Sequence, residues 1–498
     1  MFPAGPRVDS LASMTAAAFF DLDRTLLPKA SGPALSAAMR DTGVVSARMP
    51  GEALLFGYFN LLGESLGSIA LARQAVLVAK GKPADAFDEA AQLAADVLEP
   101  MVGPFARMLI EEHHEAGRLV VLATTTPEHL VLPLAERLGI DYVIATRYEV
   151  GDDGCFTGRN DGHFVWSMGK IAAVRDFAEE EGIDLDASFA YSDSIYDAPL
   201  LRAVGNPGAV NPDARLHALA VAARWPVLHF DTSPGVMKLP VIGMELQRAI
   251  ALLSRPEVFP YAKFTVRGAE NIPADGPAIL VGNHRSYFDL VAMAVAFRRT
   301  PRSARFLGKK ELFDVPGLGT IFRAGGGISV DRRQDDPDSP DAFASAVRAL
   351  RGGELVAMMP EGTIPRGIHF FEPGMRGFPG AARLAHLTEV PVIPFAITGT
   401  EKVWPRSSTV PRMLTNPLTR PEVTVTFGEP VDLKYRSVPR DMERVFEAIT
   451  AMLPDDVREP ARPTLAEMAL TYPDGVVPDE DRWYAVDGGT DSHVEYGE

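Results

Sequence analysis

The sequence predicts an α/β protein of more than one domain, in which parallel sheets are covered by helices. Short apolar runs alternate with stretches of helical periodicity along most of the chain, which is typical of strand–helix units. The 498 residues are enough for two to four domains of roughly 100–200 residues each. The composition, 46% hydrophobic and 23% charged, is that of an ordinary globular protein and excludes disordered and fibrous classes.

Residues 15–230 are predicted to form the first domain, after an unstructured stretch at residues 1–14. Apolar runs at Ala16–Phe20, Leu119–Ala123 and Ser188–Tyr191 are each followed by polar residues and a helical pattern. Between the first two runs, about residues 35–114 have helical periodicity and little strand signal. We therefore expect a parallel sheet with a helical cap above it.

Residues 231–262 are predicted to link this domain to a second one at residues 263–453. A helix of about Pro240–Leu253 in the linker would be amphipathic. A core or domain-interface helix is the preferred interpretation, and a membrane-surface helix is the alternative. The tail at residues 454–498 is rich in Asp and Pro and is expected to be loosely ordered. Strands of the second domain are expected at four apolar runs: Ala278–Gly282, Leu355–Met359, Pro391–Ile397 and Glu422–Phe427.

The chain is acidic, with a formal net charge of −17, which argues against general nucleic-acid binding. From Arg298 to Arg333, however, nine basic residues accompany three acidic ones, which indicates either an anionic partner or a solvated surface. A single cysteine excludes a disulfide scaffold. No apolar run approaches the roughly 20 residues of a membrane-spanning helix, and no secretory signal pattern is visible. We therefore expect a cytoplasmic protein, soluble or peripheral to a membrane.

Two aspartates follow the first predicted strand, in the segment FFDLDRTLL. Ligands of an α/β sheet bind beyond the carboxyl ends of its strands, so Asp21 and Asp23 stand where chemistry is expected. One carboxylate can attack a phosphorus or bind a metal while the other donates a proton. Each of the groups that follow has an ordinary structural explanation by itself, but the ordered set favours a phosphoryl-transfer site. The later strand ends and helix starts supply Thr124, Lys170, Asp193 and Asp197.

This order of motifs resembles the haloacid-dehalogenase-like phosphatases, and most closely the branch that contains phosphoserine phosphatase. The resemblance rests on DLDRT, a Thr after the second strand, a Lys, and SDSxxD, and covers about residues 15–230. It implies a Rossmann-like parallel sheet in which Asp21 forms an aspartyl-phosphate, Asp23 is the acid and base, and Thr124 and Lys170 bind phosphate. It also implies that Mg²⁺ is held by the aspartates of the motifs: Asp21, Asp23, Asp193 and Asp197.

A histidine and an aspartate five residues apart occur in the segment NHRSYFD. Of the ten histidines only His284 has an aspartate, Asp289, at this spacing. If His284 lies on the turn before a helix, the carboxylate can reach one imidazole nitrogen and leave the other as a base for a hydroxyl. Alternatively, Ser286 to Asp289 form a capping box that only closes the helix N-terminus. The two interpretations are equal on this segment alone.

Three later segments favour the catalytic interpretation. They are GGGISVDRR, LVAMMPEGTIPRG and VPVIPFAITGT. The series N-H-x4-D, G-x-x-x-V-D-R, P-E-G-T and V-P-V-I-P resembles the 1-acylglycerol-3-phosphate acyltransferases, over about residues 263–430. Two positions depart from the family pattern: Ser329 stands before V-D-R, and Ile364 stands where an arginine usually follows PEGT, with Arg366 two residues later.

This second resemblance implies an α/β glycerolipid acyltransferase domain. It would move an acyl chain from acyl-CoA or acyl-carrier protein to 1-acylglycerol-3-phosphate and form phosphatidic acid. His284 would deprotonate the acceptor hydroxyl and Asp289 would orient the imidazole. The resemblance and the basic island together place the acceptor and an anionic membrane surface at a set of polar residues: Arg332, Glu361, Gly362, Thr363, Lys309 and Lys310.

The complete sequence thus predicts a bifunctional enzyme at the inner face of the cell membrane, with oligomerisation left open. The N-terminal domain would be a Mg²⁺-dependent phosphomonoesterase that acts on phosphatidic or lysophosphatidic acid. Two alternatives remain for this domain. It hydrolyses a small soluble phosphate such as phosphoserine, or it is a non-catalytic regulatory or oligomerising module.

Overall fold

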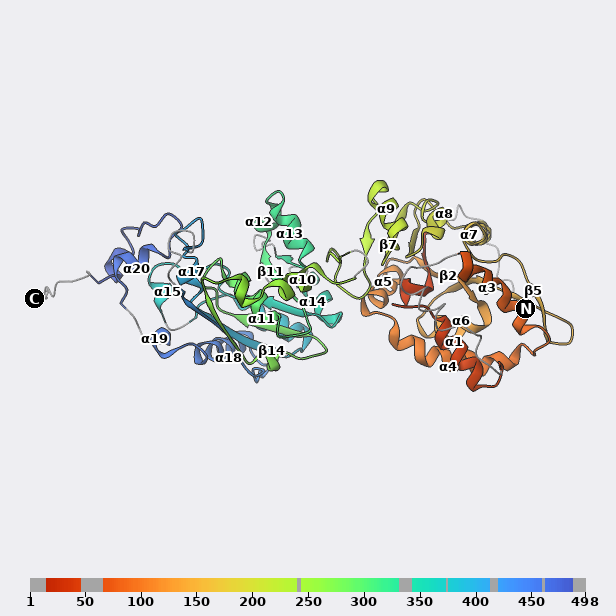
Figure 1. Cartoon of the computed structure of the whole chain (residues 1–498), viewed down its shortest axis with the longest axis horizontal. Helices are drawn as coiled ribbons and strands as arrows, with labels where there is room; N and C mark the ends of the chain where they lie inside the picture. Colours follow the sequence, from red (N-terminus) through yellow and green to blue (C-terminus); the bar gives the residue numbers. More distant parts are fainter. Residues whose placement is uncertain are drawn as a thin grey trace, which may run out of the picture. The chain divides into compact units, whose positions relative to one another are not determined.

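The computed structural model describes residues 15–45, 66–239, 243–330, 343–372, 375–412, 420–458 and 462–486. The chain divides into two compact units, Met1–Pro234 and Gly235–Glu498. In Figure 1 the first unit is coloured red to yellow-green and the second green to blue. Each unit has its own sheet covered by helices, so the predicted α/β fold class is confirmed.

The first unit contains a six-stranded parallel sheet in the order β3-β2-β1-β6-β7-β8. Its central strand β1 is buried on both faces, because Ala18 and Phe20 belong to one hydrophobic core and Ala17 and Phe19 to the other. A small antiparallel pair, β4 and β5, stands beside this sheet. The strands are β1 (Ala17–Phe20), β2 (Leu119–Pro127), β3 (Tyr142–Thr146), β4 (Tyr148–Val150), β5 (Phe156–Asn160), β6 (Phe189–Ser192), β7 (Asn206–Val210) and β8 (Val227–Leu228).

Helices fill the described part of the chain between β1 and β2, as the periodicity of residues 35–114 predicts. Apolar residues at 54–59 are an alternative to the linker helix as a membrane-contact segment, and they lie outside the described residues. The helices of this unit are α1 (Gly32–Asp41), α3 (Leu66–Ala79), α4 (Asp88–Leu98), α5 (Pro104–Glu115), α6 (Glu128–Arg137), α7 (Met168–Glu181), α8 (Ala198–Leu201) and α9 (Ala214–Ala223), with shorter turns such as η1 (Leu22–Leu26).

The second unit contains a seven-stranded sheet in the order β12-β11-β13-β10-β14-β15-β9. The five strands from β12 to β14 are parallel, and β15 runs against β14. These five strands therefore end at the same edge of the sheet. The strands are β9 (Lys263–Arg267), β10 (Ala278–Gly282), β11 (Ala304–Lys309), β12 (Ile328–Val330), β13 (Leu355–Met358), β14 (Val392–Thr398) and β15 (Glu422–Phe427).

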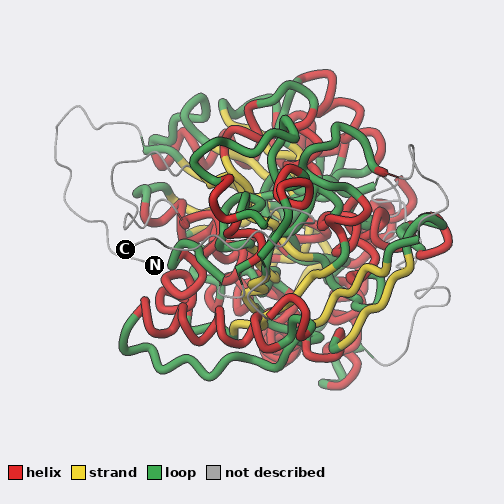
Figure 2. The backbone as a smooth tube through the Cα atoms, turned by 90° about the vertical axis from the view of Figure 1, so that its left-hand side faces the viewer, coloured by secondary structure: helices red, strands yellow, loops and turns green. Residues whose placement is uncertain are grey.

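Helices cover both faces of this sheet, and Figure 2 colours the helices, strands and loops of the whole chain. One core contains side chains of α11 and the other contains side chains of α14, α16 and α18. Among the described helices none is long and apolar enough to cross a bilayer. The helices are α11 (Asp289–Phe297), α12 (Lys310–Asp314), α13 (Leu318–Ala324), α14 (Ala344–Arg351), α15 (Ile368–Phe371), α16 (Gly380–Thr388), α17 (Thr400–Val403), α18 (Val438–Ala451) and α19 (Asp455–Arg458).

The linker helix α10 (Leu246–Leu253) is shorter than predicted and is oriented differently. Residues 240–242 lie outside the described residues, and Gly243, with φ 68°, turns the chain before the helix. The polar residues of α10 face the protein, because Gln247 and Arg248 donate hydrogen bonds to backbone carbonyls of neighbouring segments. Ile250 and Leu253 are exposed, so this face is not part of a core, and the interpretation as a domain-interface helix stays a prediction.

The tail is more ordered than the composition predicts. Helix α20 (Leu465–Ala469) begins with a capping box between Thr464 and Glu467. Met468, Tyr472 and Val477 form a small buried cluster with side chains of the second unit. The expectation of a loosely ordered tail is therefore wrong for residues 462–486. Composition indicated disorder because it does not record these few apolar anchors.

Candidate active sites

Asp21 follows β1 directly and lies beside the end of β6. Its backbone N–H donates to the carbonyl of Tyr191 at 2.9 Å, and Asp193 comes two residues after Tyr191. Because β1 and β6 are parallel neighbours, both aspartates lie at the carboxyl edge of the first sheet. Ligands of such sheets bind at this edge.

Lys170, near the start of α7, bridges two carboxylates. Its Nζ lies 2.8 Å from Asp21 Oδ1 and 2.7 Å from Asp197 Oδ2. Lys170 and Asp197 are buried, and Ser192 Oγ donates to the same oxygen of Asp197 at 2.7 Å. A buried ammonium group is unfavourable unless opposite charges lie beside it, and the two carboxylates supply them. Asp197 therefore pairs with the lysine in this structure, and its predicted role as a metal ligand stays a prediction.

Asp23 and Thr124 also lie at this edge. Burial raises the pKa of the Asp23 carboxyl, although a hydrogen bond from the Ser31 backbone N–H opposes the shift. A carboxyl with a raised pKa is suited to donate a proton. Thr124 is buried, and its Oγ1 accepts a hydrogen bond from the backbone N–H of Thr126 at 3.2 Å.

The donor set at this edge suits a hard cation. Asp21 and Asp193 offer carboxylate oxygens from adjoining strands, and Arg24 Nε lies 2.9 Å from Asp193 Oδ2. Within the described ranges no three His, Cys, Asp or Glu side chains converge as a metal site. Two carboxylates completed by main-chain oxygens and water are a common Mg²⁺ shell.

In the second unit, four parallel strands bring together residues from separate parts of the chain. Lys309 ends β11, Glu361 follows β13, His284 follows β10 and Thr400 follows β14. These strands are neighbours in the sheet, so all four residues lie at one edge.

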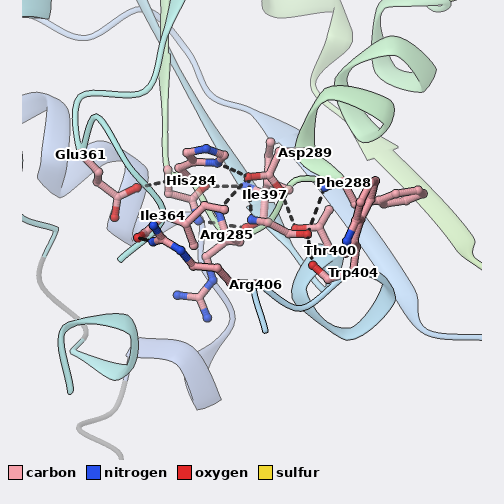
Figure 3. Close-up of polar contacts among 12 residues, drawn as sticks. His284, Arg285, Phe288, Asp289, Glu361, Ile364, Ile397, Thr400, Trp404 and Arg406 are labelled. Atoms are coloured by element: carbon pink, nitrogen blue, oxygen red, sulfur yellow. Dashed lines mark hydrogen bonds and ion pairs between the residues drawn. The ribbon is translucent and has the colours of Figure 1, made fainter. Parts of the chain in front are cut away.

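His284 and Asp289 form the central contact of this edge (Figure 3). The imidazole Nδ1 lies 2.7 Å from Asp289 Oδ2. An ionised carboxylate only accepts hydrogen bonds, so Nδ1 carries the proton and Nε2 is left as a base. Asp289 is fully buried, whereas a quarter of the His284 side chain is exposed.

Asp289 also closes the turn before α11. The same Oδ2 accepts the backbone N–H groups of Arg285, at 2.7 Å, and of Ser286, at 3.0 Å. Its Oδ1 accepts a hydrogen bond from the hydroxyl of Thr400. Asp289 therefore closes the turn that precedes α11, but the predicted capping box is not formed, because the Ser286 hydroxyl accepts the N–H of Phe288 and not that of Asp289. The role of Asp289 in orienting the imidazole stays a prediction.

Glu361 lies on the other side of His284 from Asp289 (Figure 3). Its Oε2 accepts the backbone N–H of His284 at 2.5 Å. Burial raises the pKa of Glu361 to about 7, against the opposing effects of His284 and Arg285. The carboxylate is thus engaged with the turn that carries the histidine.

Some of the other residues predicted to bind the acceptor lie at this edge, and one lies outside the described residues. Lys309 and Lys310 lie where β11 meets α12, at the same edge. Gly362 has φ 68°, and the hydroxyl of Thr363 is 3.4 Å from a nitrogen of Arg406. Arg332 lies outside the described residues.

Sequence reasoning missed Thr400 and Arg406. Thr400 is 111 residues from the aspartate that it contacts, and no local pattern marks it. Arg406 follows α17 and reaches back to the loop after Glu361. One signal in the sequence concerned this turn: the arginine that usually follows PEGT is replaced by Ile364, and Arg366 comes two residues later.

Comparison with known proteins agrees with this division. Residues 18–202 match the haloacid dehalogenase-like hydrolase family and residues 263–398 match the acyltransferase family. The "Inhibition of morphological differentiation protein" of Streptomyces azureus is 40% identical over 241 residues, which cover 48% of this chain and 86% of that protein. A phosphoserine phosphatase of Mycobacterium tuberculosis is 35% identical over 224 residues, 44% of this chain and 71% of that protein.

The second half has a plant relative. The chloroplastic 1-acyl-sn-glycerol-3-phosphate acyltransferase LPAT1 of Arabidopsis thaliana is 29% identical over 153 residues, which cover 30% of this chain and 40% of that protein. The two sheets, the polar clusters at their strand ends and the two family matches all indicate two separate enzymatic domains. The chain belongs to the haloacid dehalogenase-like hydrolases and carries an acyltransferase domain after the hydrolase domain, which makes it a bifunctional phosphatase and acyltransferase.

Proposed function

We propose that the second unit acylates 1-acylglycerol-3-phosphate to phosphatidic acid, with acyl-CoA or acyl-carrier protein as the donor. The observation that carries this proposal is the contact of 2.7 Å between the partly exposed His284 and the buried Asp289. The similarity to a plant enzyme of this named activity supports the choice of acceptor.

In this mechanism, Nε2 of His284 removes the proton from the acceptor hydroxyl. The resulting oxygen nucleophile attacks the thioester carbonyl, and the C–S bond breaks as the tetrahedral intermediate collapses. The thiolate leaves with the proton of the imidazolium. Asp289 keeps Nδ1 protonated and stabilises the imidazolium during the step.

We propose that the first unit hydrolyses a phosphomonoester through an aspartyl-phosphate. A carboxylate oxygen of Asp21 attacks the phosphorus while Asp23 protonates the departing alkoxide. Asp23 then takes a proton from the water that releases inorganic phosphate. Lys170 and Thr124 would hold the phosphoryl oxygens.

Mg²⁺ would be held by Asp21 and Asp193, where it would neutralise phosphate charge. The sequence also predicts Asp23 and Asp197 as ligands of this ion; in the structure Asp23 accepts a hydrogen bond from Ser31, and Asp197 accepts one from Lys170.

Two substrate classes compete for this first site. Phosphatidic acid, the product of the second unit, is itself a phosphomonoester, and its hydrolysis would give diacylglycerol. The relative named phosphoserine phosphatase favours a small soluble phosphate instead. Phosphate release from phosphatidic acid, lysophosphatidic acid and phosphoserine, each with Mg²⁺, separates the two classes.

We further propose that the second unit works at an anionic membrane surface. Lys309 and Lys310 offer positive charge near the site, and Ile250 and Leu253 of α10 offer exposed apolar side chains.

Formation of labelled phosphatidic acid on vesicles containing 1-acylglycerol-3-phosphate tests the acyltransferase function. Loss of the product in His284→Ala, with phosphate release unchanged, is the expected result. Product formation by this variant at the wild-type rate would reject the mechanism.

A further inference from the structure

Three arginines surround the turn after Glu361, and we refer to them as the arginine cluster: Arg285, Arg366 and Arg406. Arg285 donates to the carbonyl of Phe370 at 2.9 Å, and its guanidinium carbon lies 3.6 Å from the centre of the Phe370 ring. Arg406 donates to the carbonyl of Ile364 and to the hydroxyl of Thr363. Arg406 therefore reaches the loop after Glu361, and Arg285 reaches α15, the helix that follows this loop.

The cluster contains three guanidinium groups. The carboxyl of Glu361 interacts electrostatically with Arg285, and Arg406 has a hydrogen bond with Tyr287. Across the described ranges no carboxylate forms a salt bridge with Arg285, Arg366 or Arg406, and the Nε atoms of Arg285 and Arg406 are buried without a hydrogen-bond partner. The pKa of Arg406 is lowered, first by burial and then by the charge of Arg366. Placing like charges together and leaving buried donors unsatisfied is unfavourable unless an anion binds there.

The position of the cluster identifies that anion. Arg285 follows His284 in the sequence, and its charge reaches the buried carboxyl of Glu361. The loop that Arg406 contacts begins directly after Glu361. A phosphomonoester on the acceptor is the anion that must lie within a few bonds of the hydroxyl that His284 would deprotonate.

We propose that Arg406, supported by Arg366 and Arg285, binds the phosphate of the acceptor and makes the second unit specific for phosphomonoester lipids. This inference rests on the proposed acyltransferase function. Arg406 lies beyond residues 263–398, the part that matches the acyltransferase family. Ile364 is 2% exposed and offers only its backbone carbonyl, so the side chain at that position cannot bind the phosphate.

The C-terminal segment fixes the loops that carry the cluster. The backbone N–H of Ser407 donates to the carbonyl of Leu470 at 3.2 Å, and that of Gly367 donates to the hydroxyl of Thr471 at 2.9 Å. Arg406 and Arg366 are thus each one residue from a bond to this segment. A guanidinium held at its base loses less entropy when it binds a phosphate.

The test compares two acceptors that differ only in the phosphate, 1-acylglycerol-3-phosphate and the corresponding monoacylglycerol, both on vesicles with the same donor. In Arg406→Ala we expect KM for the phosphate acceptor to rise about 10-fold or more, since a charge-assisted contact is lost. The monoacylglycerol rate and KM for the donor should stay within about twofold. Arg406→Lys should restore part of the affinity, because it keeps the charge without the bidentate geometry.

The matched control is Arg351→Ala, at the end of α14, where the chain enters β13 at the opposite edge of the sheet from the site. A wild-type denaturant-unfolding transition of the second unit reports that each variant is folded. The inference is overturned if Arg406→Ala leaves KM for 1-acylglycerol-3-phosphate unchanged. It is also overturned if the variant lowers the rates with 1-acylglycerol-3-phosphate and with monoacylglycerol equally. A wild-type protein that acylates neither acceptor would instead reject the proposed function, and this inference with it.

Discussion

The carboxylate of Glu361 accepts a hydrogen bond from the backbone N–H of His284, across 77 residues of sequence. The turn after β13 thus fixes the turn after β10 that carries the proposed base. Burial raises the pKa of Glu361 from its ordinary value of 4.5 to about 7. Because the pKa of Glu361 in the folded protein differs from its ordinary value, the stability of the site depends on pH.

The fold favours the neutral form of Glu361. Its contribution to stability is therefore fully present below about pH 4.5 and is lost as the pH rises through about 7. Glu361→Gln keeps an acceptor for His284 and removes the charge. We expect the free energy of unfolding of this variant, relative to wild type, to increase between about pH 5 and pH 8 by up to about 3 kcal/mol.

Denaturant unfolding at these two pH values measures the difference. Glu447→Gln, an exposed position on α18, is the control and should show no such dependence. An advantage of Glu361→Gln that is equal at both pH values would show that the carboxyl does not titrate in this range.

The second prediction concerns the support of the histidine. Asp289→Asn should lower kcat of acyl transfer by roughly 10³–10⁴-fold, since the amide favours the wrong imidazole tautomer. Thr400→Val removes one hydroxyl donor from Asp289 while keeping the side-chain shape, and a loss of about 1 kcal/mol, or a few-fold in kcat, is expected.

A wild-type denaturant-unfolding transition of the second unit would show that both variants are folded. If Asp289→Asn acylates at the wild-type rate, the residue only closes the turn before α11.

The third prediction separates the roles of the two aspartates in the first unit. Asp21→Asn should abolish phosphate release and leave acyl transfer unchanged, because the nucleophile is lost. Asp23→Asn should slow alkyl phosphates by about 10²–10⁴-fold but affect p-nitrophenyl phosphate much less, since that leaving group needs no proton. In the wild type, release from alkyl phosphates should fall as the pH rises through the raised pKa of Asp23.

Equal losses on both kinds of substrate would assign Asp23 a role other than proton donor. Normal turnover by Asp21→Asn would remove the aspartyl-phosphate from the mechanism.

Much of the fold could be predicted because local patterns carried it. The runs that became β1 and β10 are apolar at every position, since both faces of each sheet are covered by helices. β9, β11 and β12 were missed, because Lys263, Arg305 and Ser329 interrupt their apolar patterns. The Arg305 guanidinium is buried between Glu245 and Glu354, a pairing that only the folded chain reveals.

The site was predictable where its residues share a motif and unpredictable where they do not. His284 and Asp289 are five residues apart and meet as expected. Thr400 and Arg406 arrive from beyond β14, and the parallel order of strands brings them to the motif. The direction in which α10 faces was also misjudged, because an amphipathic pattern does not say which side meets the protein.

The fourth prediction tests membrane attachment. The double variant Ile250→Glu/Leu253→Glu should lower flotation with anionic vesicles by about tenfold, because two exposed apolar side chains of α10 become charged. Val221→Glu places one such charge on an exposed position of α9 in the first unit and should float like wild type, as the control for either single substitution. Undiminished flotation of the double variant would exclude α10 as the docking element.

The last prediction tests whether the C-terminal segment supports acyl transfer. Gly367 has φ 55°, and a Cβ at this position would lie 2.5 Å from the hydroxyl of Tyr472, which also bonds Asp481. Gly367→Ala should therefore displace the segment and cost about 1–2 kcal/mol of stability in the second unit. If this segment holds Arg366 and Arg406 in place, KM for 1-acylglycerol-3-phosphate should rise while KM for the acyl donor stays constant.

Gly353→Ala, also at positive φ but in open space, is the matched control for backbone strain alone. A KM that rises equally in both variants would mean that strain, and not the contact with Tyr472, disturbs the site.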